Sequence, residues 1–166
     1  MERTILGFEQ DEEGEWRVIL DCGHKRHLRH DPPRENRPEL SDSLARNSAV
    51  GNTIDCGRCG QRLLPEGMEV YKSTPEFNEV TVPLGLLKDH SLKCGVWGSL
   101  VVLEGSLRFC EGALKVEVRP ETLWYVLPGV SHNVEVVGSV RFRVDFLRSA
   151  GSTNRTSHSS SEASPE

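Results

Sequence analysis

One stretch decides the fold of this chain: His90-Ser-Leu-Lys-Cys-Gly-Val-Trp-Gly-Ser-Leu-Val-Val-Leu-Glu-Gly-Ser-Leu-Arg-Phe109. Its apolar run begins at Leu100, is interrupted by Glu104-Gly105 and then resumes. This pattern predicts two strands joined by a tight turn. A second stretch, Pro128-Gly129-Val130-Ser131-His132, closes one apolar run and opens the next. Because each stretch places a histidine at the start of a strand, we expect the two histidines to share one pocket.

Short strand-like runs recur between residues 67 and 149, with glycine and proline between them. The runs are 68–72, 80–82, 97–103, 107–110, 114–118, 123–127, 134–137 and 140–147. In the last run apolar residues alternate with charged ones, as in a half-buried strand. No helical period persists, so this region is predicted to be an all-β sandwich or barrel.

Several motifs of this region resemble the TehB/YeaR-like small cupin domain. They are His90-x-x-Lys93-x-Gly95-x-Trp97-Gly98, Val102-Leu103-Glu104-Gly105, Tyr71-Lys72-x-x-Pro75, the run 140–146 and the Pro-Gly-x-x-His form of the second stretch. The resemblance covers residues 68–148 and implies a compact single-domain cupin, a double-stranded β-helix or jelly roll. It also implies a stress or tellurite-resistance context and a homodimer paired through a barrel edge. The chain stops before any methyltransferase domain, so methylation of tellurite is not expected.

The expected ligand pocket contains His90, Lys93, Trp97 and His132. One fixed positive charge and two titratable donors suit a small oxyanion or carboxylate. We therefore expect binding or sensing of a small anionic or metal-oxyanion ligand, and the residues favour a binding protein over an enzyme. The alternative for each histidine alone is a hydrogen bond to the barrel wall.

A metal-dependent cupin oxygenase or isomerase, with a second metal held by His90 and His132, is the competing function. The resemblance implies further ligands in the first motif, but Lys93 and Gly98 stand in their places. Two imidazoles alone are a poor site for Fe(II) or Mn(II), which favour two histidines with a carboxylate. Three other residues could complete such a site: Asp89, Cys94 and Glu121.

The first third of the chain carries the other cluster of histidine and cysteine. Runs 4–9 and 16–20 predict a β-hairpin, and continuing the alternation of the second run places Cys22 and His24 on one face. Residues 31–52 show no periodicity and are predicted to be unstructured. A Cys-x-x-Cys turn follows at Cys56-Gly57-Arg58-Cys59.

A structural zinc ion takes four ligands in a tetrahedron. The expected ligands are Cys22, His24, Cys56 and Cys59. His27 is the alternative fourth ligand, because a turn at Gly23 would break the parity, and His30 follows at the same spacing. A segment this small buries too little surface to fold comfortably without such a staple. Ordinary reduced cysteines are the alternative to zinc.

The signature Cys-Gly-His-x-x-His-x-x-His-x-Pro-Pro, followed by the Cys-x-x-Cys turn, resembles a small uncharacterised bacterial family. Lys25, Arg26 and Arg29 form a local basic patch beside it. This patch could dock nucleic acid or a protein partner, but a solvated strand edge is favoured. The net charge of −5 also disfavours general nucleic-acid binding.

The predicted organisation is a zinc-ribbon-like module at residues 1–66, a cupin at 67–149 and a disordered tail at 150–166. The tail is rich in serine and has no large apolar residue. Five cysteines are an odd number and do not form a disulfide framework. No run approaches the ~18 apolar residues of a membrane span. We therefore expect a cytoplasmic protein that does not enter membranes.

Overall fold

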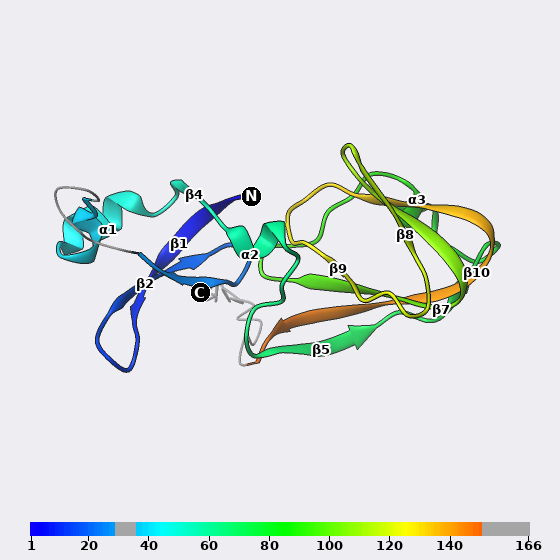
Figure 1. Ribbon diagram of the computed structural model, residues 1–166, viewed down its shortest axis with the longest axis horizontal. Coiled ribbons are helices and arrows are strands. Elements are labelled where there is room, and N and C mark those ends of the chain that lie inside the picture. Colours follow the sequence, from blue (N-terminus) through cyan, green and yellow to red (C-terminus); the bar gives the residue numbers. More distant parts are fainter. Residues whose placement is uncertain (29–35, 151–166) are drawn as a thin grey trace, which may run out of the picture.

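The computed structural model describes residues 1–28 and 36–150, and the chain is mainly β (Figure 1). Two antiparallel sheets lie end to end along the long axis, with helix α2 (Gly57–Gly60) between them. No helix in the described ranges is long and apolar enough to cross a bilayer. Apart from its first residue, the predicted tail at 150–166 lies outside the described residues.

The N-terminal sheet has four strands in the order β3-β2-β1-β4. They are β1 (Glu2–Gln10), β2 (Trp16–Leu20), β3 (Lys25–His27) and β4 (Thr53–Asp55). β1 and β2 form the predicted hairpin. Val18 and Leu20 are fully buried, so the predicted parity of β2 is confirmed.

Residues 36–52, the described part of the stretch 31–52, contain helical structure where none was predicted. The helices are η1 (Pro38–Leu40) and α1 (Ser43–Ala49). The carboxylate of Asp42 accepts hydrogen bonds from the backbone N–H groups of Leu44 and Ala45, which is an N-cap. Arg46 of α1 lies over the ring of Trp16, 3.8 Å from its centroid. The cap and this contact stabilise α1, which has no apolar stripe of the kind that buries one face of a longer helix.

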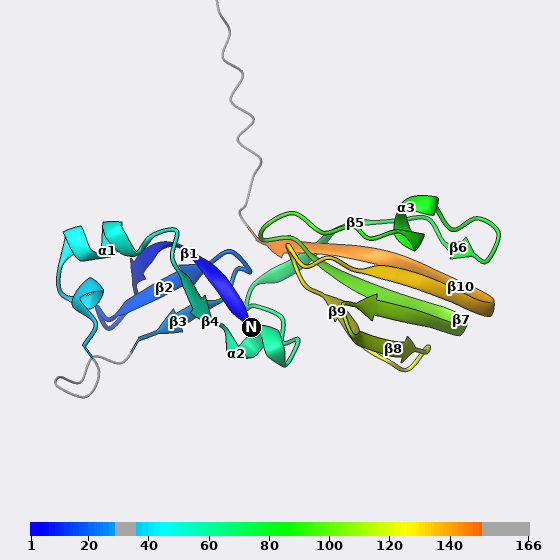
Figure 2. The same ribbon diagram turned by 90° about the horizontal axis from the view of Figure 1, so that it is seen from above.

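The C-terminal sheet is built around two long antiparallel strands, as Figure 2 shows. Its order is β5-β10-β7-β8, with β6 paired to β10 and β9 paired to β7. The strands are β5 (Met68–Ser73), β6 (Phe77–Asn78), β7 (Trp97–Glu111), β8 (Leu114–Val118), β9 (Trp124–Val126) and β10 (Asn133–Ser149). The short helix α3 (Leu84–Leu87) precedes the first histidine stretch.

The tight turn predicted at Glu104-Gly105 is wrong, because β7 runs through these residues without ending. Leu103 is an extra residue between two positions that pair with β10. Such a bulge changes which face the following side chains occupy and bends the strand. Gly105 has φ +71°, and a Cβ there would lie 2.1 Å from the carbonyl oxygen of Ser139. Glycine is therefore needed at this position, because β7 and β10 approach each other too closely there for a side chain.

Two other strand predictions also differ from the structure. The runs 134–137 and 140–147 belong to one strand, β10, which is irregular between Val136 and Val140. Residues 80–82 form no strand and instead follow β6 in a turn and a loop. Val80 is 84% exposed, so this apolar residue does not mark a strand buried in the core.

Two apolar cores result from this arrangement. One lies within the C-terminal sheet and includes Leu100, Val102, Leu107, Phe109, Val118, Val126, Val134, Val140, Phe142 and Val144. The other is shared by the two ends of the chain. It contains Ile5, Val18, Leu20, Cys22, Cys56 and Cys59 together with Trp97, Leu127 and Leu147. The cysteine cluster therefore lies at the junction of the two sheets.

Candidate metal centre and ligand cavity

The structure brings the four expected metal ligands together. Cys22, His24, Cys56 and Cys59 are all buried, and their ligand atoms lie within 4.8 Å of one another. This buried group could hold a metal ion such as zinc.

Local hydrogen bonds position the four side chains. Cys22 lies in a turn closed by the bond from the N–H of Gly23 to the carbonyl of Leu20, and Gly23 has φ +86°. The N–H of Leu20 bonds to the carbonyl of His24, so the ladder resumes beyond the turn and the parity survives it. In the Cys-x-x-Cys turn, the N–H of Cys59 donates to the carbonyl of Cys56 at 3.1 Å.

The distances within the cluster fit a tetrahedral zinc site. His24 Nδ1 is 3.4, 3.5 and 3.6 Å from the sulfur atoms of Cys22, Cys56 and Cys59. Zn–S bonds of about 2.3 Å and Zn–N bonds of about 2.05 Å at the tetrahedral angle separate nitrogen from sulfur by about 3.5–3.6 Å. His24 would therefore bind through Nδ1.

The thiols of the cluster differ in acidity. The hydrogen bond from the Cys22 thiol lowers the pKa of Cys59 to about 4, and the buried Arg3 guanidinium acts in the same direction. Donation to Cys59, together with burial, raises the pKa of Cys22, and burial raises that of Cys56. Because a metal binds thiolates, its binding would release protons from these two thiols.

The alternative ligands and the basic patch lie elsewhere. The side chain of His27 is 59% exposed, and its Nε2 is 3.3 Å from a carboxylate oxygen of Asp11. His30 and Arg29 lie outside the described residues. The ammonium of Lys25 pairs with Glu9 at 2.9 Å. Arg26 donates to a backbone carbonyl of β4.

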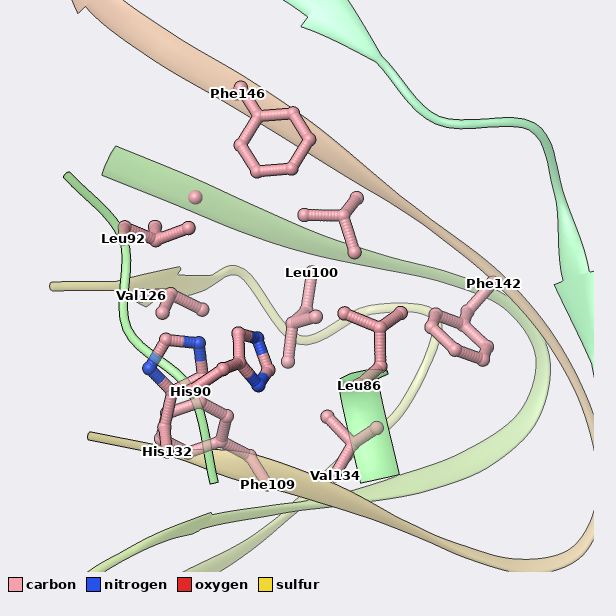
Figure 3. A pocket seen from close by; sticks show the side chains of 12 residues that line it. Leu86, His90, Leu92, Leu100, Phe109, Val126, His132, Val134, Phe142 and Phe146 are labelled. Atoms are coloured by element: carbon pink, nitrogen blue, oxygen red, sulfur yellow. The ribbon is translucent and has the colours of Figure 1, made fainter. Parts of the chain in front are cut away.

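A second candidate site is a cavity of about 100 Å³ inside the C-terminal sheet (Figure 3). The two imidazoles lie next to each other, and apolar side chains form the rest of the wall. The lining residues are Leu86, His90, Leu92, Gly98, Leu100, Phe109, Val126, His132, Val134, Phe142, Val144 and Phe146. None of them carries a fixed charge.

His90 and His132 face each other in an isolated antiparallel bridge outside the named strands, so His90 does not begin a strand as predicted. Each donates its backbone N–H to the carbonyl of the other, at 3.0 and 2.8 Å. Directly opposed residues of an antiparallel pair project from the same face. Their ring centroids are accordingly 4.3 Å apart. The backbone pairing explains why two histidines 42 positions apart reach one cavity.

The hydrogen bonds of the two rings identify their tautomers. Nδ1 of His90 is 2.9 Å from the carbonyl oxygen of Lys88, and Nδ1 of His132 is 2.8 Å from that of Val130. A carbonyl oxygen only accepts, so both Nδ1 atoms carry a proton. Burial lowers the pKa of His132. The neutral ring therefore presents Nε2 as an acceptor.

The other two residues expected in the pocket do not line it. Lys93 is exposed. Trp97 is fully buried in the shared core, where its Nε1–H donates to the carbonyl of Cys22 at 2.7 Å. Its ring meets that of His24 edge to face, with centroids 5.6 Å apart. Trp97 therefore packs against the candidate metal centre.

The three residues considered as extra metal ligands also lie away from the cavity lining. Asp89 accepts a hydrogen bond from Asn133, and the thiol of Cys94 donates to the carbonyl of Asp21. Glu121 is exposed.

Sequence reasoning missed two residues near the cavity. Phe109 stacks on His132 with centroids 5.5 Å apart, and its alternation with the buried Leu107 could have placed it on the inner face. The guanidinium of Arg62 also lies over the ring of Phe109, 5.3 Å from its centroid. No local pattern marks Arg62, because its partners come from strands about 50 or more positions later.

Comparison with known proteins gives a separate family for each end of the chain. Residues 72–144 match the TehB-like domain. Residues 6–63 match DUF3565, a family described as a protein of unknown function. The TehB-like part of the predicted resemblance is thus supported. No curated protein matches the chain.

Two solved structures are similar to the TehB-like end. TehB from Haemophilus influenzae shares 26% sequence identity over 51% of this chain and 32% of its own length, with a TM-score of 0.48. A protein from E. coli strain K12 shares 23% identity over 52% of this chain and 96% of its own length, with a TM-score of 0.49. The chain therefore spans about a third of the length of TehB.

Proposed function

We propose that this protein binds a small, largely apolar molecule that carries a hydrogen-bond donor such as a hydroxyl group. The binding site is the cavity of a small TehB-like cupin, and a zinc-stabilised module is packed against it. The observation that carries the proposal is the tautomer of the histidine pair. Both Nδ1–H groups are engaged with backbone carbonyls, so Nε2 is the acceptor of each neutral ring, and we propose that the ligand donates to it.

The size and lining of the cavity limit the ligand. A volume of about 100 Å³ is below the ~300–1,000 Å³ of most drug-sized sites. It is also somewhat below the ~150 Å³ of an engineered cavity that accepts benzene. Small alcohols, phenols and similar molecules match both the apolar wall and the paired acceptors.

The anionic or metal-oxyanion ligand expected from the sequence is less well supported. An anion needs donors, and the exposed Lys93 does not supply one to this cavity. At neutral pH the lowered pKa of His132 keeps its Nε2 unprotonated. Tellurite binding in a resistance context therefore enters our test as a competing outcome.

Two other functions from the sequence analysis have less support. A catalytic metal would need ligands beyond His90 and His132, and no carboxylate or thiolate of the described chain lines the cavity. Docking of nucleic acid would use Lys25 and Arg26, which already bond to groups of their own sheet.

The ligand can be tested by NMR titration of the full chain with phenol, benzene, benzoate and tellurite. We expect phenol to bind about three- to tenfold more tightly than benzene, which is the effect of one net hydrogen bond. His132→Asn should weaken this preference, because asparagine can keep the bond to Val130 but lacks Nε2, which leaves His90 as the remaining imidazole acceptor. Tighter binding of benzoate or tellurite than of phenol at pH 7.5 would overturn the assignment.

The zinc assignment is tested by plasma mass spectrometry of the full chain, because the shared core argues against cutting it into fragments. We expect about one zinc per chain. Cys59→Ser should lose it, whereas His27→Gln should retain it. Loss of zinc from the His27 variant, with retention in the Cys59 variant, would contradict the ligand set.

A further inference from the structure

Arg62 lies between the candidate metal centre and the ligand cavity. Its N–H donates to the carbonyl of Cys59 at 3.0 Å, so it belongs to the turn that presents two of the metal ligands. Among the described non-glycine residues it alone has a positive φ, +52°. Such a conformation persists only where surrounding contacts determine it.

The guanidinium of Arg62 is held by the C-terminal sheet. It donates to the carbonyl of Tyr125 at 3.0 Å and to the carboxylate of Glu111 at 2.7 Å. The ion pair is largely shielded, with side chains 13% and 11% exposed. The cation also lies over the ring of Trp124, 4.5 Å from the centroid. Planar, forked donors make arginine suited to several such contacts at once.

These contacts lead directly to the cavity wall. Arg62 lies on Phe109, and Phe109 stacks on His132 with an interplanar angle of 27°. A second link reaches the same wall, because Arg3 donates to the carbonyl of Pro128 at 2.7 Å, just before the loop that carries His132.

We propose that Arg62 is a positioning residue that makes the ligand cavity depend on the metal centre. With a metal bound, the Cys56–Cys59 turn holds Arg62 in place, and Arg62 holds Phe109 against His132. Without the metal the turn loses its anchor, and this wall of the cavity is no longer fixed. The proposal rests on the proposed function in that it describes how the same cavity is regulated.

The inference can be tested without any ligand, by following the ring signals of His132 by NMR while pH is varied. Burial is the main cause of the lowered pKa of His132. Of the titratable and charged groups around it, His90 and Arg62 also lower this pKa and Glu111 raises it. Releasing the Arg62 guanidinium by removing zinc with a chelator should therefore raise the pKa of His132. Arg62→Met should abolish this response to zinc. Arg46→Met is the matched control, because it removes another arginine stacked on an aromatic ring, at Trp16.

The outcomes separate this inference from the ligand assignment. An unchanged His132 titration after verified loss of zinc, in a chain that circular dichroism shows to be folded, would overturn it. If the zinc-free chain unfolds, the zinc-loaded proteins decide: Arg62→Met must raise the pKa of His132 and Arg46→Met must not. Titration of the same samples with phenol tests the ligand assignment separately. If the pKa of His132 responds to zinc but phenol does not bind, the coupling is supported and only the ligand assignment is rejected.

Discussion

Replacing Trp97 with phenylalanine tests whether the two ends of the chain form one core. The indole Nε1–H is the partner of the Cys22 carbonyl in a fully buried environment. Leaving that carbonyl without a donor costs about 1–3 kcal/mol. The smaller ring adds about 1 kcal/mol of lost apolar burial. We therefore expect the free energy of unfolding to fall by about 2–4 kcal/mol.

The assay is urea unfolding at a fixed free zinc concentration, because an ion bound only by the folded state adds to the measured stability. Zinc affinity should also fall about tenfold, as for other residues that support metal ligands. Trp16→Phe is the matched control, because Trp16 is half-buried and its Nε1 makes no described hydrogen bond. Its free energy of unfolding should fall by less than about 1 kcal/mol. Equal losses in the two variants would refute the reasoning.

Two further predictions concern the bent strand and the histidine pair. Gly105→Ala should lower the free energy of unfolding by more than about 3 kcal/mol or prevent folding, because its Cβ would collide with the backbone of Ser139. Gly112→Ala is the control, because Gly112 also has a positive φ but has open space around it. In urea unfolding this control should cost about 1–2 kcal/mol. The lowered pKa of His132 means that the unfolded chain binds more protons just below the usual value of 6.5, so stability falls as pH drops through that region. His132→Asn should lose less stability than the wild type between pH 7.5 and 5.5, and an equal loss would contradict the assigned pKa shift.

The metal cluster was the part of the candidate site most accessible from sequence. Alternation in β2 is a local property, and continuing it past Leu20 correctly placed Cys22 and His24 on the buried face. The turn at Gly23 did not spoil this because the ladder resumes at His24. The Cys-x-x-Cys turn supplied the other two ligands, since a short turn holds its ends together wherever it occurs.

The errors arose where one local pattern has two structural solutions. A change of apolar parity around Glu104-Gly105 can be produced by a turn or by a bulge, and only the long partner strand β10 selects the bulge. The helix α1 was missed because it is held by the cap at Asp42 and by Trp16, with no apolar stripe of its own.

The sequence by itself determined the β character of the chain, the four side chains of the candidate metal cluster and the meeting of His90 with His132 in one pocket. Each of these follows from strand alternation, ligand chemistry or motif position. Only the tertiary structure decided that Trp97 packs against the candidate metal centre, that Lys93 stays outside the cavity and that Arg62 contacts Phe109 and Glu111. The physical reason is sequence separation: the bond from Trp97 to Cys22 spans 75 positions. The contacts of a side chain with residues so far away in the sequence depend on how the two sheets pack. No local periodicity in the sequence reveals that packing.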